Sequence, residues 1–315
     1  MVARVFIDGA HGTTGLEIAD RLAGRKEFSL VRIGDAERKD RSARADALNG
    51  SDLVILCLPD EAAREAVSLL RNPAVRVIDA STAHRVDPAW VYGFAELEPG
   101  QFGRIAEARR VSNPGCYATG FLALVRPLVR EGLIPADWPL NATGLSGYSG
   151  GGRAMIEEFE KRGAPHYVET VARTYALALT HKHVPEMTKH AGLVHAPVFS
   201  PTVARYYRGM IVEVPLQLWA LPRQPSAAEI HGVLAANYRG LRLVEVAPLA
   251  EAADMKTLDA ELMKNTNRMK LFVFENAREK QARLVAVLDN LGKGAAGAAV
   301  QNLNLMLGLP ETAGL

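Results

Sequence analysis

Cysteine is scarce in this chain, with two residues among 315. Two cysteines provide no disulfide framework, which suits the reducing cytoplasm. The chain also lacks a CxxC pair and an HExxH motif, two frequent signatures of metal sites. We therefore expect a cytoplasmic protein that holds no metal.

Long apolar runs and an excess of one charge are absent as well. No apolar run approaches the ~18 residues of a membrane span, and the N-terminus is a strand-like segment that runs into a glycine loop, not a signal peptide. The 37 basic and 35 acidic residues are interspersed, which argues against a nucleic-acid surface. We expect a globular protein of two domains that binds neither membrane nor nucleic acid.

The first third of the chain alternates strand and helix patterns. The β patterns occupy residues 2–7, 30–34, 53–58 and 75–80, and the helical patterns occupy residues 16–22 and 60–70. This alternation predicts a parallel sheet with right-handed crossovers, which is the α/β architecture of a Rossmann-type domain.

A glycine-rich turn, GAHGTTG at residues 9–15, joins the first strand pattern to the first helix pattern. Its G-x-x-G-x-x-G spacing is a variant of the dinucleotide fingerprint, in the strand–helix context that the fingerprint needs. Glycine lets the backbone approach a pyrophosphate, and the helix N-terminus donates N–H groups to that anion. A purely structural turn is the alternative. We expect a dinucleotide to contact Gly9, Gly12, Thr13, Thr14 and Gly15.

The segment after the second strand pattern bears on the choice of cofactor. Asp35 would accept a hydrogen bond from a ribose 2′-hydroxyl and favour NAD. Four cations follow within residues 38–44, among them Arg38, Lys39 and Arg41, and they would pair with a 2′-phosphate. We expect NADP because the cations outnumber the acid; the alternative is a solvated, charged loop.

The later part of the chain has a different texture. Its β patterns, at residues 141–147, 175–180, 194–197, 210–218 and 241–246, are separated by longer loops. They predict an α+β domain with a largely antiparallel sheet. We expect an NADP-binding domain of residues 1–115, completed by a C-terminal helix within 290–315, and a catalytic and oligomerisation domain of residues 116–289.

The segment SNPGCYAT, residues 112–119, places Cys116 after a strand and a Pro-Gly turn, before an apolar helix pattern at residues 117–129. Unpaired N–H groups and the helix dipole favour a thiolate at such a position and can hold an oxyanion. The alternative is a small buried residue at a tight turn. Cys57 lies in a continuous apolar run with no base nearby, so we expect it to be structural.

The segment THKHVPEM, residues 180–187, is the chief titratable cluster. Residues two apart in an extended segment face the same side, so His181 and His183 can both face a cleft. We expect His181, at the end of a strand, to be the acid/base and His183 to be a binding or supporting group. Either histidine alone could be an exposed polar residue. Glu186 suits the N-terminus of the helix pattern at residues 185–191.

Three other segments offer anion donors or close packing. GLSGYSGGGR, residues 144–153, is rich in N–H and hydroxyl donors and can wrap an anion, or be a flexible connection. DASTAHR, residues 79–85, ends the fourth strand, so Arg85 is a candidate anion clamp or a surface salt bridge. DNLGKGAAG, residues 289–297, precedes a helix pattern and allows close packing against a cofactor, or is a plain glycine-capped helix start.

Together these motifs resemble the N-acetyl-gamma-glutamyl-phosphate reductase family, in its shorter, second type. The matching segments, residues 9–15, 79–85, 112–119, 181–187 and 293–297, run in order over essentially the whole chain. The aspartate-semialdehyde dehydrogenase relatives share the architecture and chemistry, but they resemble the chain less around residues 181–186. One departure is His84, where many relatives have Phe.

The resemblance implies an oxidoreductase of arginine biosynthesis, in which NADPH reduces N-acetyl-gamma-glutamyl phosphate to N-acetylglutamate semialdehyde and phosphate. It implies Cys116 as the nucleophile and a histidine of residues 181–183 as the acid/base. The expected cofactor contacts are Gly9, Gly12, Thr13, Thr14, Gly15, Arg38, Ser81, Asn290, Lys293 and Gly294. The expected substrate contacts are Arg85, Asn113, Ser146, Ser149, Gly150 and Glu186. A homodimer or homotetramer is expected, since apolar strands of the second domain would leave a broad sheet face uncovered in a monomer.

Two other functions stay open on the residues alone. A related acyl-phosphate reductase, acting on aspartyl phosphate or a carrier-bound aminoadipyl derivative, would differ in pocket residues that sequence indicates poorly. A non-enzymatic nucleotide sensor would keep the glycine turn but would need no cysteine and histidine pair. The joint presence of Cys116, His181 and His183 argues against the sensor.

Overall fold

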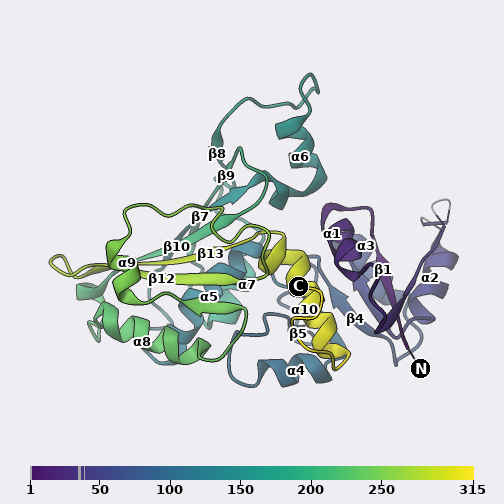
Figure 1. The fold of residues 1–315 in the computed structure, drawn as a ribbon, viewed down its shortest axis with the longest axis horizontal. Helices are drawn as coiled ribbons and strands as arrows, with labels where there is room; N and C mark the ends of the chain where they lie inside the picture. Colours follow the sequence, from purple (N-terminus) through teal and green to yellow (C-terminus); the bar gives the residue numbers. More distant parts are fainter. Residues whose placement is uncertain (1, 35–36, 39) are drawn as a thin grey trace. The chain divides into compact units, whose positions relative to one another are not determined.

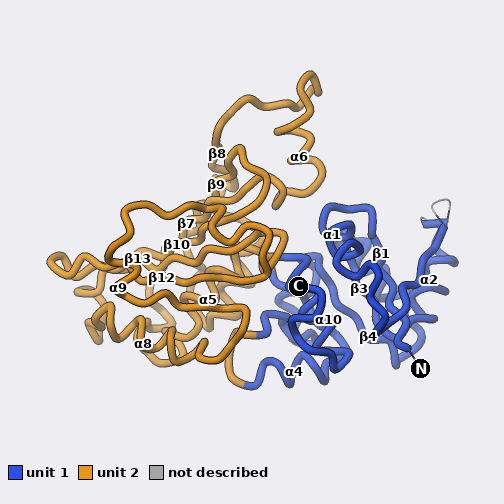
Figure 2. The backbone as a smooth tube through the Cα atoms, in the orientation of Figure 1, with its two compact units in different colours: residues 1–95, 100–114, 295–315 blue, residues 96–99, 115–294 orange. Residues whose placement is uncertain are grey.

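The structure is a computed structural model that describes residues 2–34, 37–38 and 40–315 (Figure 1). Two residues of the cofactor hypothesis, Asp35 and Lys39, lie outside the described residues. The chain divides into two compact units (Figure 2): unit 1 comprises residues 1–95, 100–114 and 295–315, and unit 2 comprises residues 96–99 and 115–294. The expected domain boundaries at residues 115 and 290 stay a prediction.

Unit 1 is built on a sheet whose neighbouring strands pair in parallel, in the order β2-β1-β3-β4-β6-β5. The strands are β1 (Ala3–Asp8), β2 (Phe28–Val31), β3 (Leu53–Leu56), β4 (Arg76–Asp79), β5 (Val91–Tyr92) and β6 (Arg110–Ser112). All residues of β3 are buried, as is typical of a central strand covered on both faces.

Helices cover both faces of this sheet. They are α1 (Thr13–Leu22), α2 (Arg41–Asn49), α3 (Asp60–Ser68), α4 (Gln101–Glu107) and α10 (Gly297–Met306). Ile18 of α1, Ile105 of α4 and Leu303 of α10 belong to one hydrophobic core, and Leu48 of α2 and Ala63 of α3 belong to another. Parallel strands between two helical layers form the doubly wound arrangement that binds ligands at the carboxyl ends of its strands.

Unit 2 contains a mixed, mostly antiparallel sheet in the order β11-β12-β13-β10-β7-β9-β8. The strands are β7 (Asn141–Gly147), β8 (Ala172–Thr174), β9 (Val198–Ala204), β10 (Met210–Gln217), β11 (Val244–Val246), β12 (Met269–Asn276) and β13 (Gln281–Leu288). Within the described residues, only β7 with β9 and β11 with β12 pair in parallel. The predicted combination of a Rossmann-type sheet with a largely antiparallel sheet is therefore confirmed.

Unit 2 contains five helices among the described residues, and α7 and α8 pack against α5, the helix that carries Cys116. The five helices are α5 (Cys116–Arg130), α6 (Gly152–Glu160), α7 (Val184–Ala191), α8 (Ala227–Tyr238) and α9 (Leu249–Asp254), with short turns η1 (Tyr148–Gly151), η2 (Leu218–Ala220) and η3 (Gly292–Ala296). A Cβ atom at Gly120 would lie 2.8 Å from Cγ2 of Val212 in β10, so α5 lies tightly on the sheet. The Tyr238 hydroxyl of α8 donates to the Ala123 carbonyl at 2.8 Å. These contacts hold α5 between sheet and helix.

Two of the predicted strands of unit 2 are wrong. Residues 175–180 form a turn, in which Ala176 and Leu179 have φ of 53° and 60°, values incompatible with extended backbone. Residues 194–197 are a loop, and β9 begins only after Pro197, which has no N–H to donate to a sheet. The strands β12 and β13 were not predicted, although they form the longest hairpin of the sheet.

Candidate active site

Cys116 is the first residue of α5. The preceding Gly115 caps the helix with extended backbone, and its carbonyl accepts the Thr119 N–H at 2.8 Å, the first bond of the helix. The Cys116 side chain is half-buried at the end of the helix where backbone N–H groups have no intrahelical partner. The predicted position of the thiol, at a helix N-terminus after β6 and a Pro-Gly turn, is therefore found.

Gly294 lies directly against this cysteine. A Cβ atom at Gly294 would come 2.7 Å from Cβ of Cys116, so any side chain there would collide with the cysteine. The missing side chain of Gly294 therefore makes room for Cys116 within unit 2. The expected contact of Gly294 with a cofactor stays a prediction.

Cys57 has a different environment. It follows β3 in unit 1, and burial raises the pKa of its thiol to about 12, with a further rise from the neighbouring carboxylates of Asp79 and Asp8. A thiol with such a pKa stays protonated at neutral pH, and a protonated thiol is a poor nucleophile. The contrast supports a structural role for Cys57.

His181 and His183 lie together, with ring centroids 4.6 Å apart and planes at 81°. The backbone N–H of His183 donates to Nδ1 of His181 at 3.1 Å. An imidazole nitrogen that accepts a hydrogen bond carries no proton, so neutral His181 holds its proton on Nε2. The strand that was expected to hold His181 is absent, and this backbone contact orients the ring in its place.

Two tyrosines that were not singled out from the sequence extend the hydrogen-bonded series that starts at His181. The Tyr175 hydroxyl lies 3.4 Å from Nε2 of His181 and donates to the Tyr117 hydroxyl, also at 3.4 Å, and Tyr117 donates to the Thr202 carbonyl at 3.3 Å. Burial raises the pKa of Tyr175 to about 12; the hydrogen bond with Tyr117 opposes this rise, and the charge of Cys116 adds to it. Tyr117 directly follows Cys116 in the sequence. This adjacency is the one sequence signal that could have indicated the series of hydrogen bonds from His181 to Thr202.

Glu186 joins the histidines to the cysteine turn. It lies in the first turn of α7 and is 1% exposed. Its Oε2 accepts the Gly115 N–H at 3.1 Å, and its Oε1 lies 3.9 Å from Nε2 of His183. A carboxylate at this distance stabilises the positively charged form of an imidazole. Glu186 therefore contacts the residue before Cys116, the candidate nucleophile, and one of the two candidate acid/base histidines.

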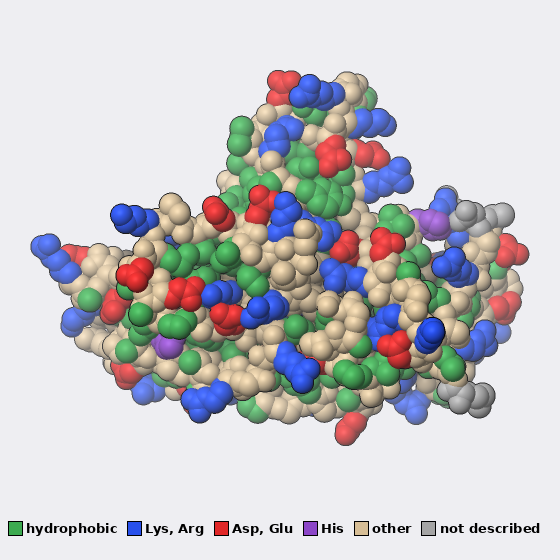
Figure 3. All heavy atoms as spheres, in the orientation of Figure 1, with side chains coloured by type: hydrophobic (Ala, Val, Ile, Leu, Met, Phe, Trp, Pro, Cys, Tyr) green, Lys and Arg blue, Asp and Glu red, His purple; other side chains and the backbone are tan. Residues whose placement is uncertain are grey.

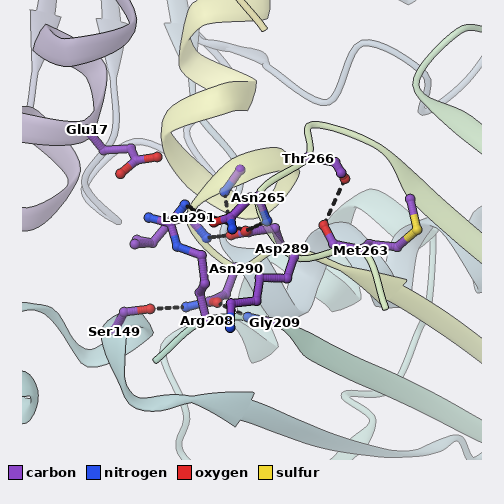
Figure 4. A network of polar contacts seen from close by, with 12 residues as sticks. Glu17, Ser149, Arg208, Gly209, Met263, Asn265, Thr266, Asp289, Asn290 and Leu291 are labelled. Carbon is purple, nitrogen blue, oxygen red and sulfur yellow. Dashed lines mark hydrogen bonds and ion pairs between the residues drawn. The ribbon is translucent and has the colours of Figure 1, made fainter. Parts of the chain in front are cut away.

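A polar network fixes the loop that follows β7 (Figure 4). Asn290 Nδ2 donates to Ser149 Oγ at 2.9 Å, and Asn290 Oδ1 accepts the Gly209 N–H at 2.8 Å. Ser146 Oγ donates to the Gly147 carbonyl at 3.0 Å, whereas Gly150 is exposed. The amide of Asn290 is thus engaged within unit 2, where it ties β10 and η1 to the end of β13.

Lys293 also has an internal partner. Its ammonium lies 2.7 Å from Oε2 of Glu96, and both side chains are 1% exposed. A buried pair of this kind satisfies the charge of each member, and breaking it is costly. The Lys293 ammonium therefore has a buried structural partner, and its expected contact with a cofactor stays a prediction.

Unit 1 contains a cavity of about 800 Å³ beside the glycine-rich turn. Its lining includes Gly9, Gly12 and His11 of that turn and Arg32 and Arg38 beyond β2. The expected contacts Thr13 and Thr14 begin α1. The cavity lies at the carboxyl ends of β1 and β2, where a doubly wound sheet binds ligands.

The three glycines of the turn serve different purposes. Gly9 has a φ of 89°, and a Cβ there would lie 2.3 Å from the Cys57 carbonyl oxygen. A Cβ at Gly15 would lie 2.4 Å from the Gly9 carbonyl oxygen, so both positions require glycine for internal reasons. At Gly12 the nearest atom would be 3.6 Å away, an ordinary contact. Internal packing therefore does not require glycine at position 12, which is the N-cap of α1, and its expected contact with a dinucleotide stays a prediction.

The basic residues near this cavity are not equivalent. Arg44 donates from Nε and Nη2 to Oδ2 of Asp8, at 3.2 and 2.9 Å, and is therefore committed to a buried carboxylate. Arg41 pairs with Glu65 at 3.6 Å on the surface. Arg38 and Arg32 are exposed and line the cavity. Arg32 was missed by the sequence reasoning because it falls inside the second β pattern.

Arg85 lies at the carboxyl ends of two neighbouring strands. Its Nε donates to the Asn113 carbonyl at 3.0 Å after β6, and its Nη2 donates to the Ala80 carbonyl at 3.3 Å after β4. The Asn113 side chain is engaged as well: Nδ2 donates to the Ala295 carbonyl and Oδ1 accepts from Asn302. Ser81 Oγ donates to Asp79 at 2.8 Å. The side chains of Asn113 and Ser81 are therefore used in hydrogen bonds within unit 1. The guanidinium of Arg85 is the positively charged group at these strand ends.

None of the helices described here combines the length and apolarity that a membrane crossing needs. No cluster of three or more His, Cys, Asp or Glu side chains placed to hold a metal ion occurs in residues 2–34, 37–38 and 40–315.

Comparisons with known proteins identify the family of the chain. The semialdehyde dehydrogenase NAD binding domain matches residues 4–105, and the semialdehyde dehydrogenase dimerisation domain matches residues 116–290. The N-acetyl-gamma-glutamyl-phosphate reductases of Brucella ovis and Brucella canis are each 54% identical over 309 residues, which are 98% of this chain and 100% of theirs.

Solved structures show the same fold at low identity. Aspartate semialdehyde dehydrogenase II of Vibrio cholerae, complexed with ASA, has a TM-score of 0.72 at 16% identity and covers 98% of each chain. Aspartate semialdehyde dehydrogenase with NADP from Candida albicans has a TM-score of 0.64 at 15% identity and covers 98% of this chain and 99% of its own.

Proposed function

Because this chain belongs to the N-acetyl-gamma-glutamyl-phosphate reductase family, we propose that it reduces N-acetyl-gamma-glutamyl phosphate to N-acetylglutamate semialdehyde and phosphate with NADPH. This is a cytoplasmic step of arginine biosynthesis. The observation that carries the proposal is Cys116 at the first position of α5, joined through Gly115 and Glu186 to the histidine pair. A thiol, an acid/base and N–H donors are the groups that reduction of an acyl phosphate through a thioester requires.

The thiolate of Cys116 attacks the acyl carbonyl, so that a carbon–sulfur bond forms as the bond to phosphate breaks. The N–H groups at the start of α5 stabilise the oxyanion, and Arg85 pairs with the phosphate. NADPH, when bound, supplies the hydride that reduces the thioester. A histidine then gives a proton to the oxygen, which yields the thiohemiacetal. As the carbon–sulfur bond breaks, that proton passes from the oxygen to the sulfur, so the aldehyde leaves and the thiol of Cys116 is restored.

We assign the proton to His183 rather than to His181, which reverses the expectation from the sequence. Nδ1 of His181 accepts a peptide N–H, so a second proton on that ring would break this bond. His183 lies beside Glu186, which stabilises the imidazolium that a proton donor must form. His181, whose ring nitrogens contact the His183 N–H and the Tyr175 hydroxyl, is then a supporting group that shapes the substrate site.

The proposed cofactor is NADP. Arg32 and Arg38 at the cavity of unit 1 are the support, because exposed guanidinium groups can pair bidentately with a 2′-phosphate. Gly9 and Gly12 are proposed to lie against the pyrophosphate, with Thr13, Thr14 and Gly15 at the start of α1.

A homodimer or homotetramer is proposed for the assembly. The matching family model for residues 116–290 is described as a dimerisation domain, and Val198 of β9 is a large apolar residue that is 45% exposed on the sheet of unit 2. Light scattering at micromolar concentration is expected to give at least twice the mass of the 34.1 kDa chain. A monomer mass would contradict the proposal.

The activity is tested in the oxidative direction. The purified chain is mixed with N-acetylglutamate semialdehyde, phosphate and NADP, and NADPH formation is followed by absorbance. We expect phosphate-dependent turnover, with aspartate semialdehyde as the matched control giving a far lower rate. Faster turnover of aspartate semialdehyde would support the aspartate-specific alternative, and turnover without phosphate would contradict acyl-phosphate chemistry.

A further inference from the structure

The loop that carries Arg85 is organised around one buried carboxylate. Asp79 ends β4 and is 0% exposed. It accepts the Ser81 N–H at 2.9 Å, the Ser81 hydroxyl at 2.8 Å and Nδ1 of His84 at 2.6 Å. A carboxylate removed from water requires donors of this kind, and losing one leaves a buried charge less compensated.

His84 is held from two sides. Its Nδ1 contacts Asp79, and its ring stacks on Trp90 with centroids 4.2 Å apart and planes at 15°. Because Asp79 can only accept when ionised, Nδ1 carries the proton, and the tautomer of His84 is fixed. The side chain is 7% exposed, so the ring is almost fully enclosed by the protein.

Arg85 follows His84 directly and depends on the same loop. Its Nη2 donates to the Ala80 carbonyl, one residue after Asp79, and its Nε donates to the Asn113 carbonyl. The Asn113 N–H in turn donates to the Asp79 carbonyl at 2.7 Å. Ala80 directly follows Asp79, and Asn113 is hydrogen-bonded to the Asp79 backbone, so both of these carbonyl acceptors belong to residues held by the segment that Asp79 and His84 organise.

We propose that His84 is a positioning residue for Arg85: the hydrogen bond from His84 to Asp79 sets the loop so that the guanidinium faces the phosphate. The inference rests on the proposed function, in which Arg85 pairs with that phosphate. The Trp90 stack keeps the ring in place, but the Nδ1–Asp79 bond carries the effect. In this role His84 does not contact the reacting groups itself but helps Arg85 to bind the phosphate group.

Two variants separate the bond from the stack. His84→Asn places an amide Nδ2 near the position of Nδ1 and keeps the donor without the ring. His84→Phe keeps an aromatic ring against Trp90 without the donor. Inorganic phosphate is varied in the oxidative assay at saturating NADP and N-acetylglutamate semialdehyde, and NADP binding is measured as a control of the fold.

His84→Phe is expected to raise the KM for phosphate by about ten-fold, the size of one charge-assisted hydrogen bond, with NADP affinity unchanged. His84→Asn is expected to stay near the parental KM. A parental KM for His84→Phe, or equal damage in both variants, would overturn the inference. Arg85→Ala is the reference: if it leaves the KM for phosphate unchanged, the proposed role of Arg85 fails first.

The parental protein provides a second measurement if His84→Phe does not fold. Nitrogen-15 NMR of labelled histidine, with His84→Asn identifying the signal, reports which ring nitrogen bears the proton. We expect protonation at Nδ1. A neutral His84 protonated only at Nε2 would exclude the bond to Asp79 and overturn the inference.

Discussion

The carboxylate of Glu186 accepts a hydrogen bond from the backbone N–H of Gly115 at 3.1 Å, although 71 positions separate the two residues. Gly115 is the cap of α5, so this bond connects the start of the cysteine helix to the first turn of α7. The second oxygen of the same carboxylate lies 3.9 Å from His183. One buried side chain thus contacts both the residue before Cys116 and the imidazole of His183.

Replacing Glu186 with Gln removes the charge and keeps an acceptor for Gly115. Without a carboxylate nearby, the imidazolium of His183 is less stable, so its pKa falls. The limb of the pH–rate profile that belongs to this histidine is expected to move to lower pH by about one unit or more. The measurement is the pH dependence of kcat in both directions of the reaction.

Glu157→Gln is the matched control, since Glu157 pairs with Arg153 on the exposed surface of α6. It is expected to leave the profile unchanged, because exposed ion pairs contribute little. An unchanged profile in Glu186→Gln would show that Glu186 does not act on the titrating group.

The two cysteines offer an internal comparison. Cys116→Ala is expected to abolish turnover and leave NADP binding intact, because the thiol forms the covalent intermediate and the glycine turn belongs to unit 1. Cys57→Ala is expected to retain kcat and to lower the free energy of unfolding by about 1 kcal/mol, the centre of the range for single substitutions. Rapid-quench detection of an acyl-enzyme checks the first outcome; near-parental turnover by Cys116→Ala would contradict the covalent mechanism.

The sequence was sufficient for the position of Cys116 because local rules determine it. A glycine cap, a Pro-Gly turn and an apolar helix pattern predicted a helix from residue 117, and α5 begins at Cys116. The parallel sheet of unit 1 could also be predicted from local patterns, because strand patterns that alternate with helix patterns are typical of parallel sheets.

The sequence was insufficient to predict contacts and turns that depend on residues far away in the chain. The partners of Asn290 and Lys293, which are Ser149 and Glu96, are far away in the chain, so no local pattern could predict these two bonds. The expected cofactor contacts of Asn290 and Lys293 stay predictions. The apolar residues at 175–180 suggested a strand, but positive φ at Ala176 and Leu179 folds them into the turn that brings Tyr175 to His181. Neither partner choice nor backbone handedness is visible in a local pattern.

The proposed preference for NADP can be tested at three arginines, of which Arg32 and Arg38 line the cavity and Arg41 pairs with Glu65. Arg38→Ala and Arg32→Ala are each expected to raise the KM for NADP by about ten-fold or more, if the phosphate contact is desolvated, and to leave the KM for NAD nearly unchanged. Arg41→Ala is the control, because Arg41 pairs with Glu65 on the surface. Initial rates with both cofactors check this. Equal use of NAD and NADP by the parental enzyme would remove the basis of the assignment.

The last prediction distinguishes the two histidines. His183→Asn is expected to lower kcat by about 100-fold or more, within the 10²–10⁴ that general acid–base catalysis contributes. His181→Asn is expected mainly to raise the KM for the semialdehyde, since it removes an interaction common to ground and transition states.

The pH–rate profile provides the decisive measurement. In semialdehyde oxidation the acid/base must be neutral to accept a proton, so the rate falls as the pH drops below its pKa. This limb should disappear in His183→Asn and persist in His181→Asn. Tyr175 does not account for such a limb, because its pKa of about 12 keeps it protonated throughout. If His181→Asn loses the limb and His183→Asn keeps it, the two roles must be exchanged. If neither substitution lowers kcat by more than about ten-fold, histidine general catalysis is excluded here.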